Sequence, residues 1–175
     1  MKKRSTKQLT FTALVGALYV ILSCFSNIFG LSFGPFQCRF SEALTVLPFL
    51  CPASVWGLFA GCLLFNILSP YGIPDLIFGS MATLLAGLLT ARCKNKWLAP
   101  LPPVLCNGLI VGALLAYYQA GFTAAFPAAF AFQGFFVALG EAAACFGLGM
   151  PLLAVLARTG IFSEDEGNLR GARLM

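Results

Sequence analysis

Five long apolar stretches, separated by short polar or proline- and glycine-rich breaks, make up most of this chain. They run from about residues 9 to 29, 43 to 68, 76 to 91, 98 to 118 and 130 to 156. An α-helix needs roughly 20 predominantly apolar residues to cross about 30 Å of bilayer. The pattern therefore predicts a bundle of membrane-spanning helices.

The second stretch contains Pro48 and Pro52 near its middle. A proline lacks the backbone N–H and bends or ends a helix, so this stretch crosses once with a kink or forms two shorter spans. Lys and Arg near span ends favour the cytoplasmic side. With two spans, the basic clusters at 2–7, 92–96 and 158–173 all lie on that side, whereas one span places the cluster at 92–96 outside.

We therefore predict an all-α integral membrane protein with six transmembrane helices and cytoplasmic N and C termini. The spans are expected at about residues 8–29, 39–51, 53–69, 75–91, 98–119 and 130–157, in a single membrane domain at 1–160 that precedes a polar cytoplasmic tail at 161–175. The second span is short, because a helix from Ser41 to Cys51 rises only about 16 Å. Either it begins earlier, near Gln37, or it is a partial helix that lines a cavity.

The composition supports a membrane protein. Hydrophobic residues make up 59% of the 175 positions, charged residues make up 10%, and the net charge is +5. Such a chain has no soluble face on which to bind nucleic acid, so we interpret the basic residues as signals of topology. The first residues could pass for a signal peptide. The sequence after them is more apolar still, so we interpret them as the start of the first span.

Metal and redox sites are not indicated. The chain has no histidine, and its seven cysteines are scattered without a C-x-x-C spacing. We therefore expect no metal site, no disulfide framework and no cofactor. The cysteines are interpreted as small apolar residues that fill the core.

Polar residues in or beside the apolar stretches form the candidate site. A charged group near the bilayer centre costs roughly 2.5 to 3.5 kcal/mol, so such residues are functional candidates by default. Together they could line one polar pocket that opens outward. The charged members are Arg39, Glu42, Asp75 and Glu141, and the amides are Gln37, Asn66, Asn107 and Gln133.

Most of these residues also have a structural interpretation. Arg39 and Glu42 share a helix face at i and i+3 and could satisfy each other, with Ser41 as the helix cap. Asp75 follows Gly-Ile-Pro and suits a helix N-terminus. The two asparagines could be hydrogen bonded between helices. Glu141 has no basic residue within a helical turn, so it is the strongest functional candidate.

Several classes of protein are disfavoured. The chain has no P-loop, so it does not hydrolyse ATP itself, and it has no H-E-x-x-H or G-x-S-x-G motif of a hydrolase. It is also too short for the paired inverted halves of a large secondary transporter. A small-x-x-x-small element at Ala13, Gly16 and Ala17 offers a surface on which another helix could dock.

Three stretches carry a resemblance to a known family. They are RFSEALTVLPFLCP at 39–52, GLFAGCLLFNILSPYGIPDLIFGSMATLLAGLLT at 57–90 and GEAAACFGLGMPL at 140–152. With six short spans and the Ala-x-x-x-Ala element in the first, the chain resembles the QueT family, substrate-binding S components of energy-coupling factor (ECF) transporters.

The resemblance implies a multi-pass subunit of the prokaryotic plasma membrane that captures a queuosine precursor outside the cell. The ligand would be queuine or 7-aminomethyl-7-deazaguanine. The subunit would dock through Ala13 and Ala17 on a transmembrane coupling protein that is driven by two cytoplasmic ATPases.

The chemistry of a guanine-like ring suggests roles for the polar residues. Its adjacent N1–H and 2-amino donors suit a carboxylate, for which we expect Glu141. Glu42 takes either this edge or a cationic substituent, Arg39 donates to the 6-oxo group, and the amides orient the ring.

Other interpretations stay open. The chain could be an S component for a flavin, folate or thiamine, or a stand-alone carrier in which Glu141 titrates. An intramembrane enzyme or a purely structural membrane subunit are further alternatives.

Overall fold

The computed structural model describes residues 6–34 and 37–159, and this part of the chain is helical throughout with no β-strand. The elements in chain order are α1 (Thr6–Ile28), the 3₁₀ helix η1 (Phe40–Phe49), α2 (Ser54–Asn66), α3 (Ile73–Arg92), the short 3₁₀ helix η2 (Lys96–Leu98), α4 (Leu101–Ala120), α5 (Phe126–Ala142), the π-helical η3 (Ala143–Gly149) and α6 (Met150–Arg158). The predicted all-α fold is confirmed for the described residues.

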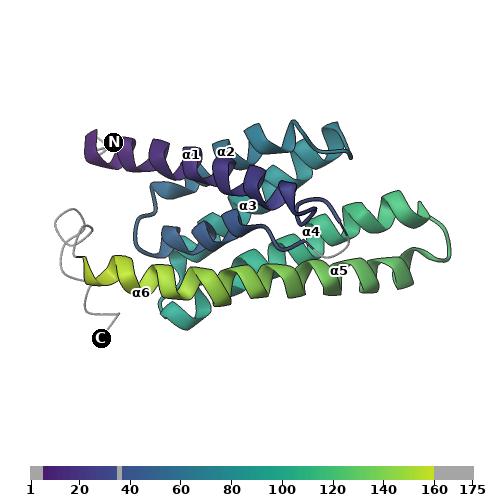
Figure 1. The fold of residues 1–175 in the computed structure, drawn as a ribbon. Coiled ribbons are helices and arrows are strands. Elements are labelled where there is room, and N and C mark those ends of the chain that lie inside the picture. Colours follow the sequence, from purple (N-terminus) through teal and green to yellow (C-terminus); the bar gives the residue numbers. More distant parts are fainter. Residues whose placement is uncertain (1–5, 35–36, 160–175) are drawn as a thin grey trace.

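Four helical segments are long and apolar enough to cross a membrane. They are Gln8–Ile28, Ile73–Arg92, Lys96–Ala120 and Phe126–Arg158, and they lie at the first, fourth, fifth and sixth predicted spans. The last of them joins α5, η3 and α6 into one long helix along the bundle (Figure 1). The chain is therefore a multi-pass membrane protein.

The second and third predicted spans are shorter than a full crossing. The segments η1 and α2 contain 10 and 13 residues, because the chain breaks between them at residues 50–53. Length and composition thus support four spans among the described residues, and the count of six stays a prediction.

The short segment η1 lies inside the bundle. It begins at Phe40 and not near Gln37, so the interpretation as a partial helix is the one that the structure supports. At about 2.0 Å per residue, ten residues of 3₁₀ helix rise roughly 20 Å. Every residue from Ser41 to Phe49 is buried, and the segment lies between α1 and the long α5–α6 helix (Figure 1).

Glycines allow the helices on either side to approach closely. A Cβ atom added at Gly61 of α2 would lie 2.7 Å from the carbonyl oxygen of Gly16 and 2.9 Å from Cβ of Tyr19, both on α1. On α4, a Cβ atom at Gly112 would lie 2.5 Å from Cα of Gly134 on α5. Small residues at such contacts are typical of membrane helices, where packing replaces the hydrophobic effect as the driving force.

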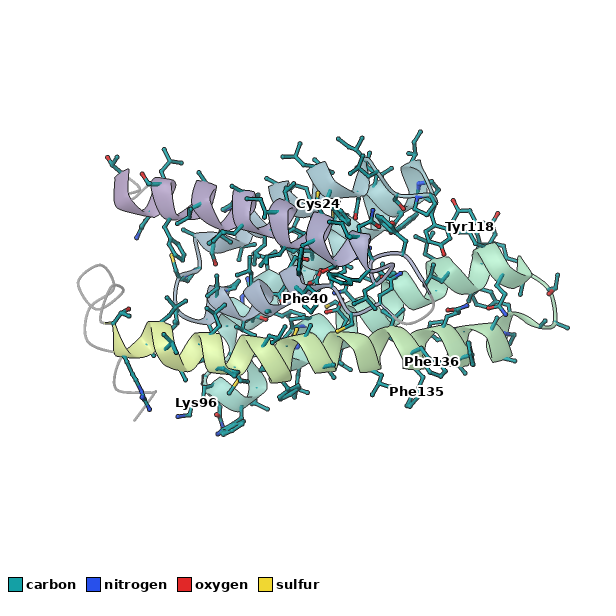
Figure 2. All side chains as sticks on the ribbon, viewed as in Figure 1. Cys24, Phe40, Lys96, Tyr118, Phe135 and Phe136 are labelled. Carbon is teal, nitrogen blue, oxygen red and sulfur yellow. The ribbon has the colours of Figure 1, made fainter. Side chains whose placement is uncertain are left out.

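Basic residues gather at one end of the bundle. Helix α1 begins and α6 ends at this end (Figure 1), and Lys96 lies there while Tyr118 lies at the opposite end (Figure 2). An apolar cluster that includes Cys93, Ala99 and Leu153 joins the end of α3, the start of α4 and α6. The basic residues at 2–4, 170 and 173 lie outside the described part of the chain.

Candidate functional site

Four charged side chains come together in the interior of the bundle. Arg39, Glu42, Asp75 and Glu141 are 7%, 2%, 2% and 4% exposed, and they come from the start of η1, from η1 itself, from α3 and from α5. The charge of Arg39 acts on Glu42 and on Glu141, and the charge of Asp75 acts on Arg39. These are the four charged residues that the sequence singled out, and they form one group, here called the charged cluster.

Arg39 is held by contacts outside the acidic residues. Its Nε donates a hydrogen bond to the carbonyl oxygen of Ser32 at 2.8 Å, and its guanidinium donates to Oδ1 of Asn66 at 3.4 Å. The guanidinium carbon lies 5.0 Å from the ring centroid of Phe33 and 5.5 Å from that of Phe65, both within cation–π range. Backbone, amide and aromatic groups therefore surround the cation.

Arg39 and Glu42 do not satisfy each other. Across residues 6–34 and 37–159 no side-chain hydrogen bond or ion pair joins them, and only their backbones are bonded, from the Glu42 N–H to the Arg39 carbonyl at 3.1 Å. Ser41 does not cap the helix either, because η1 has Arg39 at its N-cap and the Ser41 hydroxyl bonds to Ser23. The interpretation as a self-contained pair is not what the structure shows.

Glu42 has one bonded oxygen and one unbonded oxygen. The hydroxyl of Tyr19, on α1, donates to Oε1 in a short hydrogen bond. Oε2 is buried and has no hydrogen-bond partner. A buried acceptor without a partner is costly, roughly 1 to 3 kcal/mol, so it calls for a group that would satisfy it.

Glu141 lies on α5 at the last turn before the π-helical segment. Its Oε2 receives a weak hydrogen bond from the thiol of Cys145 at 3.9 Å. Its neighbour Gly140 packs so closely on the backbone of Gln37 that a Cβ atom has no room. Burial, and then the charge of Glu141, raise the pKa of the Cys38 thiol in the loop before η1. The loop at 37–39 therefore lies directly against Glu141.

Asn66 and Asp75 have structural hydrogen-bond partners. Asn66 Nδ2 donates to the carbonyl oxygen of Asp75 at 3.3 Å and to the sulfur of Cys62 at 3.4 Å. Asp75 lies in the first turn of α3, and its Oδ2 accepts from the hydroxyl of Ser69 at 2.5 Å. The structural interpretations of Asn66 as an interhelical bond and of Asp75 as a residue of a helix start are confirmed.

The remaining amides keep unbonded polar atoms. Asn107 lies next to Glu141, and its Nδ2 has no hydrogen bond of normal geometry. Gln133 Nε2 donates to Oε1 of Gln119 at 2.7 Å, whereas its own Oε1 is buried without a partner. Together with Glu42 they provide one free donor and two free acceptors inside the bundle.

Sequence reasoning missed several side chains of this region. Tyr19 bonds to Glu42, Gln119 bonds to Gln133, and Cys145 donates to the carbonyl oxygen of Glu42 at 3.4 Å as well as to Glu141. Cys62 and Cys145 do fill the apolar core, as expected, and their sulfurs also take part in hydrogen bonds. The spacing of hydroxyls on α1 at residues 19, 23 and 26 is the signal that could have found Tyr19.

The predicted docking element on α1 divides into two faces. Ala13 and Ala17 are exposed. Gly16 faces inward instead, and a Cβ atom there would lie 3.0 Å from the carbonyl oxygen of Gly57 on α2. Of the three residues, only the alanines lie on a face that this chain leaves open.

Comparisons with known proteins match this chain to a family of transporters. The family model described as "QueT transporter" matches residues 9–158. A curated relative, the "Queuosine precursor transporter QueT" of Lactococcus lactis subsp. cremoris (strain MG1363), is 36% identical over 101 residues. That match covers 55% of this chain and 59% of the relative, so the chain spans less than two thirds of the relative's length. No solved structure matches.

Proposed function

Since the chain belongs to the QueT transporter family, we propose that it is a membrane transporter subunit that binds a queuosine precursor, a 7-deazaguanine such as queuine or its aminomethyl precursor. The observation that carries this proposal is the pair of buried polar atoms without partners at Glu42 and Asn107, close to the carboxylate of Glu141, with a third such atom at Gln133 two turns earlier on α5. Binding sites for small heterocycles combine an apolar enclosure with a few such polar groups that fix orientation.

The chemistry of a guanine-like ring matches this set. Its N1–H and 2-amino group lie side by side and suit the carboxylate of Glu141, whose Oε2 accepts a long, weak hydrogen bond from the Cys145 thiol at 3.9 Å. The 6-oxo group needs a donor, and Asn107 Nδ2 is free. Arg39 uses two of its five N–H donors on Ser32 and Asn66, so others are left for the same group.

The other predicted ligand residues have supporting roles in this proposal. Gln133 offers its free Oε1 to a ring donor. Gln37 holds the loop against α5, and Asn66 and Asp75 brace Arg39 and the start of α3.

The energy for uptake comes from partners in this proposal. The chain has no P-loop, so we place it as the S component of an ECF transporter, with a transmembrane coupling protein and two cytoplasmic ATPases. The exposed alanines Ala13 and Ala17 on α1 are the proposed docking surface. The basic end of the bundle faces the cytoplasm in this proposal. Residues 1–160 form one membrane domain that crosses the bilayer six times, and η1 and α2 are the two short crossings.

The test is isothermal titration of the purified protein in detergent. We expect queuine and 7-aminomethyl-7-deazaguanine to bind with a Kd in the micromolar range or tighter, which is about −8 kcal/mol or better. Riboflavin, folate and thiamine are the controls. Binding of a control in place of the deazaguanines would identify an S component for another heterocycle. Uptake by proteoliposomes that hold this protein alone would identify a stand-alone carrier.

A further inference from the structure

Three hydroxyl side chains of α1 bond to the first three residues of η1. Residues 19, 23 and 26 are spaced at i, i+4 and i+7, so they share one face of the helix. The bonds run from Tyr19 to Glu42 Oε1, from Ser23 to the Ser41 hydroxyl at 2.7 Å, and from the Phe40 N–H to the Ser26 hydroxyl at 2.8 Å. We call these three bonds the hydroxyl ladder, and it aligns the start of η1 with α1.

Tyr19 fixes the carboxylate of Glu42 from one side. Tyr19 and Glu42 are 0% and 2% exposed, so water does not compete for their bond. With Oε1 held by the phenol, Oε2 is the end of the carboxylate without a partner. Recognition of two adjacent donors needs both oxygens of a carboxylate. Glu42 is therefore suited to a single donor, and the two-donor edge of the ring is left to Glu141.

The charged cluster favours a cation as that donor. Three carboxyl groups and one guanidinium share the buried cluster, and Oε2 of Glu42 is the carboxyl oxygen there that is buried without a hydrogen-bond partner. The hydrogen bonds of Arg39 go to Ser32 and Asn66 and not to Glu42. A buried charge without a bonded partner of opposite sign is strongly unfavourable, so a protonated amine at Oε2 would be stabilised more than a neutral donor.

We propose that Oε2 of Glu42 binds the amine of the ligand's 7-substituent, and that Tyr19 is the positioning residue that holds the carboxylate for this contact. This inference rests on the proposed function and deepens it, because it assigns the two ends of the ligand to different carboxylates. Glu42 recognises the substituent, and Glu141 recognises the ring edge.

The test compares two ligands that differ only in the amine. 7-Aminomethyl-7-deazaguanine carries it, and 7-methyl-7-deazaguanine keeps the ring and lacks it. The unaltered protein should bind the amine ligand at least about tenfold more tightly, the size of one charge-assisted hydrogen bond. Glu42→Gln keeps the shape of the side chain and should bring the ratio of the two dissociation constants close to one.

Tyr19→Phe tests the positioning role. The ring remains to pack against Leu58 and Leu47 in the core, but the carboxylate loses its anchor. The preference for the amine ligand, measured as the ratio of the two dissociation constants, should fall at least about threefold while the 7-methyl ligand still binds. Thr90→Val is the control, because it removes a buried hydroxyl that bonds to Ala99 at the basic end, away from Tyr19 and Glu42. It should leave the ratio unchanged within about twofold.

Each outcome decides a separate point. If the unaltered protein binds the two ligands with nearly equal dissociation constants, the amine contact is overturned without any variant. The proposed function still stands in that case if both ligands bind. The amine contact is also overturned if Glu42→Gln leaves the ratio of the two dissociation constants unchanged. The positioning role of Tyr19 is overturned if Tyr19→Phe leaves the ratio of the two dissociation constants unchanged. It is also overturned if the Tyr19→Phe protein binds neither ligand. If neither deazaguanine binds the unaltered protein, the proposed function fails and this inference fails with it.

Discussion

Glu141 is a carboxylate inside a membrane helix, and the Asn107 amide and the Cys145 thiol lie beside it. It is 4% exposed, and the Cys145 sulfur lies 3.9 Å from its Oε2. Asp75 is equally buried, but Ser69 donates to its carboxylate at 2.5 Å. The sequence already favoured a structural role for Asp75 and a functional one for Glu141, and the structure adds the hydrogen-bond partner that separates them.

We predict that Glu141→Gln weakens binding of 7-aminomethyl-7-deazaguanine by about tenfold to hundredfold. The amide keeps the shape but loses the charge and one of two acceptors, and a hydrogen bond to a charged group contributes roughly 1.5 to 3 kcal/mol. Isothermal titration measures the change. Thr90→Val is the control, because Thr90 is buried and bonds to Ala99 at the basic end, away from the charged cluster. An unchanged affinity in Glu141→Gln removes this residue from the site.

At the scale of elements, the contact between α1 and α2 depends on residues without side chains. Gly16 on α1 faces Gly57 and Gly61 on α2, and the inward face of the same helix carries Tyr19 to Glu42. A change in the spacing of these two helices therefore displaces the hydroxyl ladder. The sequence identified the small residues of α1 and assigned all three to an external partner, whereas the structure uses Gly16 within the chain.

We predict that Gly61→Ala destabilises the protein by about 1 to 3 kcal/mol, the usual cost of overpacking. The added methyl group would lie 2.7 Å from the backbone oxygen of Gly16, which has no flexible end to move aside. Thermal unfolding in detergent measures the effect. Gly147→Ala is the matched control, because a Cβ atom there meets nothing within 4 Å, and it should be neutral or slightly stabilising. Equal unfolding temperatures for the two variants would contradict the close contact.

At the scale of the whole molecule, the two ends of the bundle differ in character. The described basic residues Arg92, Lys94, Lys96 and Arg158 belong to the ends of α3 and α6 and to the segment that precedes α4. The opposite end has aromatic side chains, among them Tyr71 and Tyr118, whose rings lie 5.1 Å apart. Burial and then the charge of Asp75 raise the pKa of Tyr71, which therefore stays protonated and donates to the carbonyl oxygen of Phe33.

We predict that the basic end faces the cytoplasm, as the positive-inside rule requires. A cysteine introduced as Thr123→Cys, in the loop between α4 and α5, should react with a membrane-impermeant maleimide in intact cells. Asn95→Cys, next to η2, should react only after permeabilisation. The reverse pattern would contradict the orientation, and labelling of both in intact cells would contradict opposite sides. The background for both variants replaces the partly exposed cysteines Cys24, Cys38, Cys93 and Cys106 with alanine.

We also predict that Ala17→Trp abolishes copurification of the coupling protein while the deazaguanine still binds. A bulky ring on the exposed face of α1 prevents close approach of a partner helix. Ala128→Trp is the control, since Ala128 is an exposed alanine on α5, away from the proposed docking surface. Copurification measures complex formation and titration measures binding. Loss of the complex in both variants, or in neither, would contradict docking through α1.

The amino-acid sequence was enough to predict the membrane class, the positions of the four long helices, the family and eight polar residues that prove to be buried. These follow from local properties, because hydropathy, helix-breaking prolines and motif letters need no knowledge of which segments are neighbours. It also placed the break at residues 50–53 that makes η1 and α2 short.

Which of the polar residues have hydrogen-bond partners depends on how the helices pack together. Asn66 bonds to the backbone of Asp75 on α3, and Asp75 accepts from Ser69 in the loop before that helix. Glu42 is left with one free oxygen because Tyr19, 23 residues earlier, holds the other. Cys145 reaches the backbone of Glu42 across 103 residues of sequence. Hydrogen bonds between distant segments depend on how the helices pack, and no local pattern in the chain contains that information.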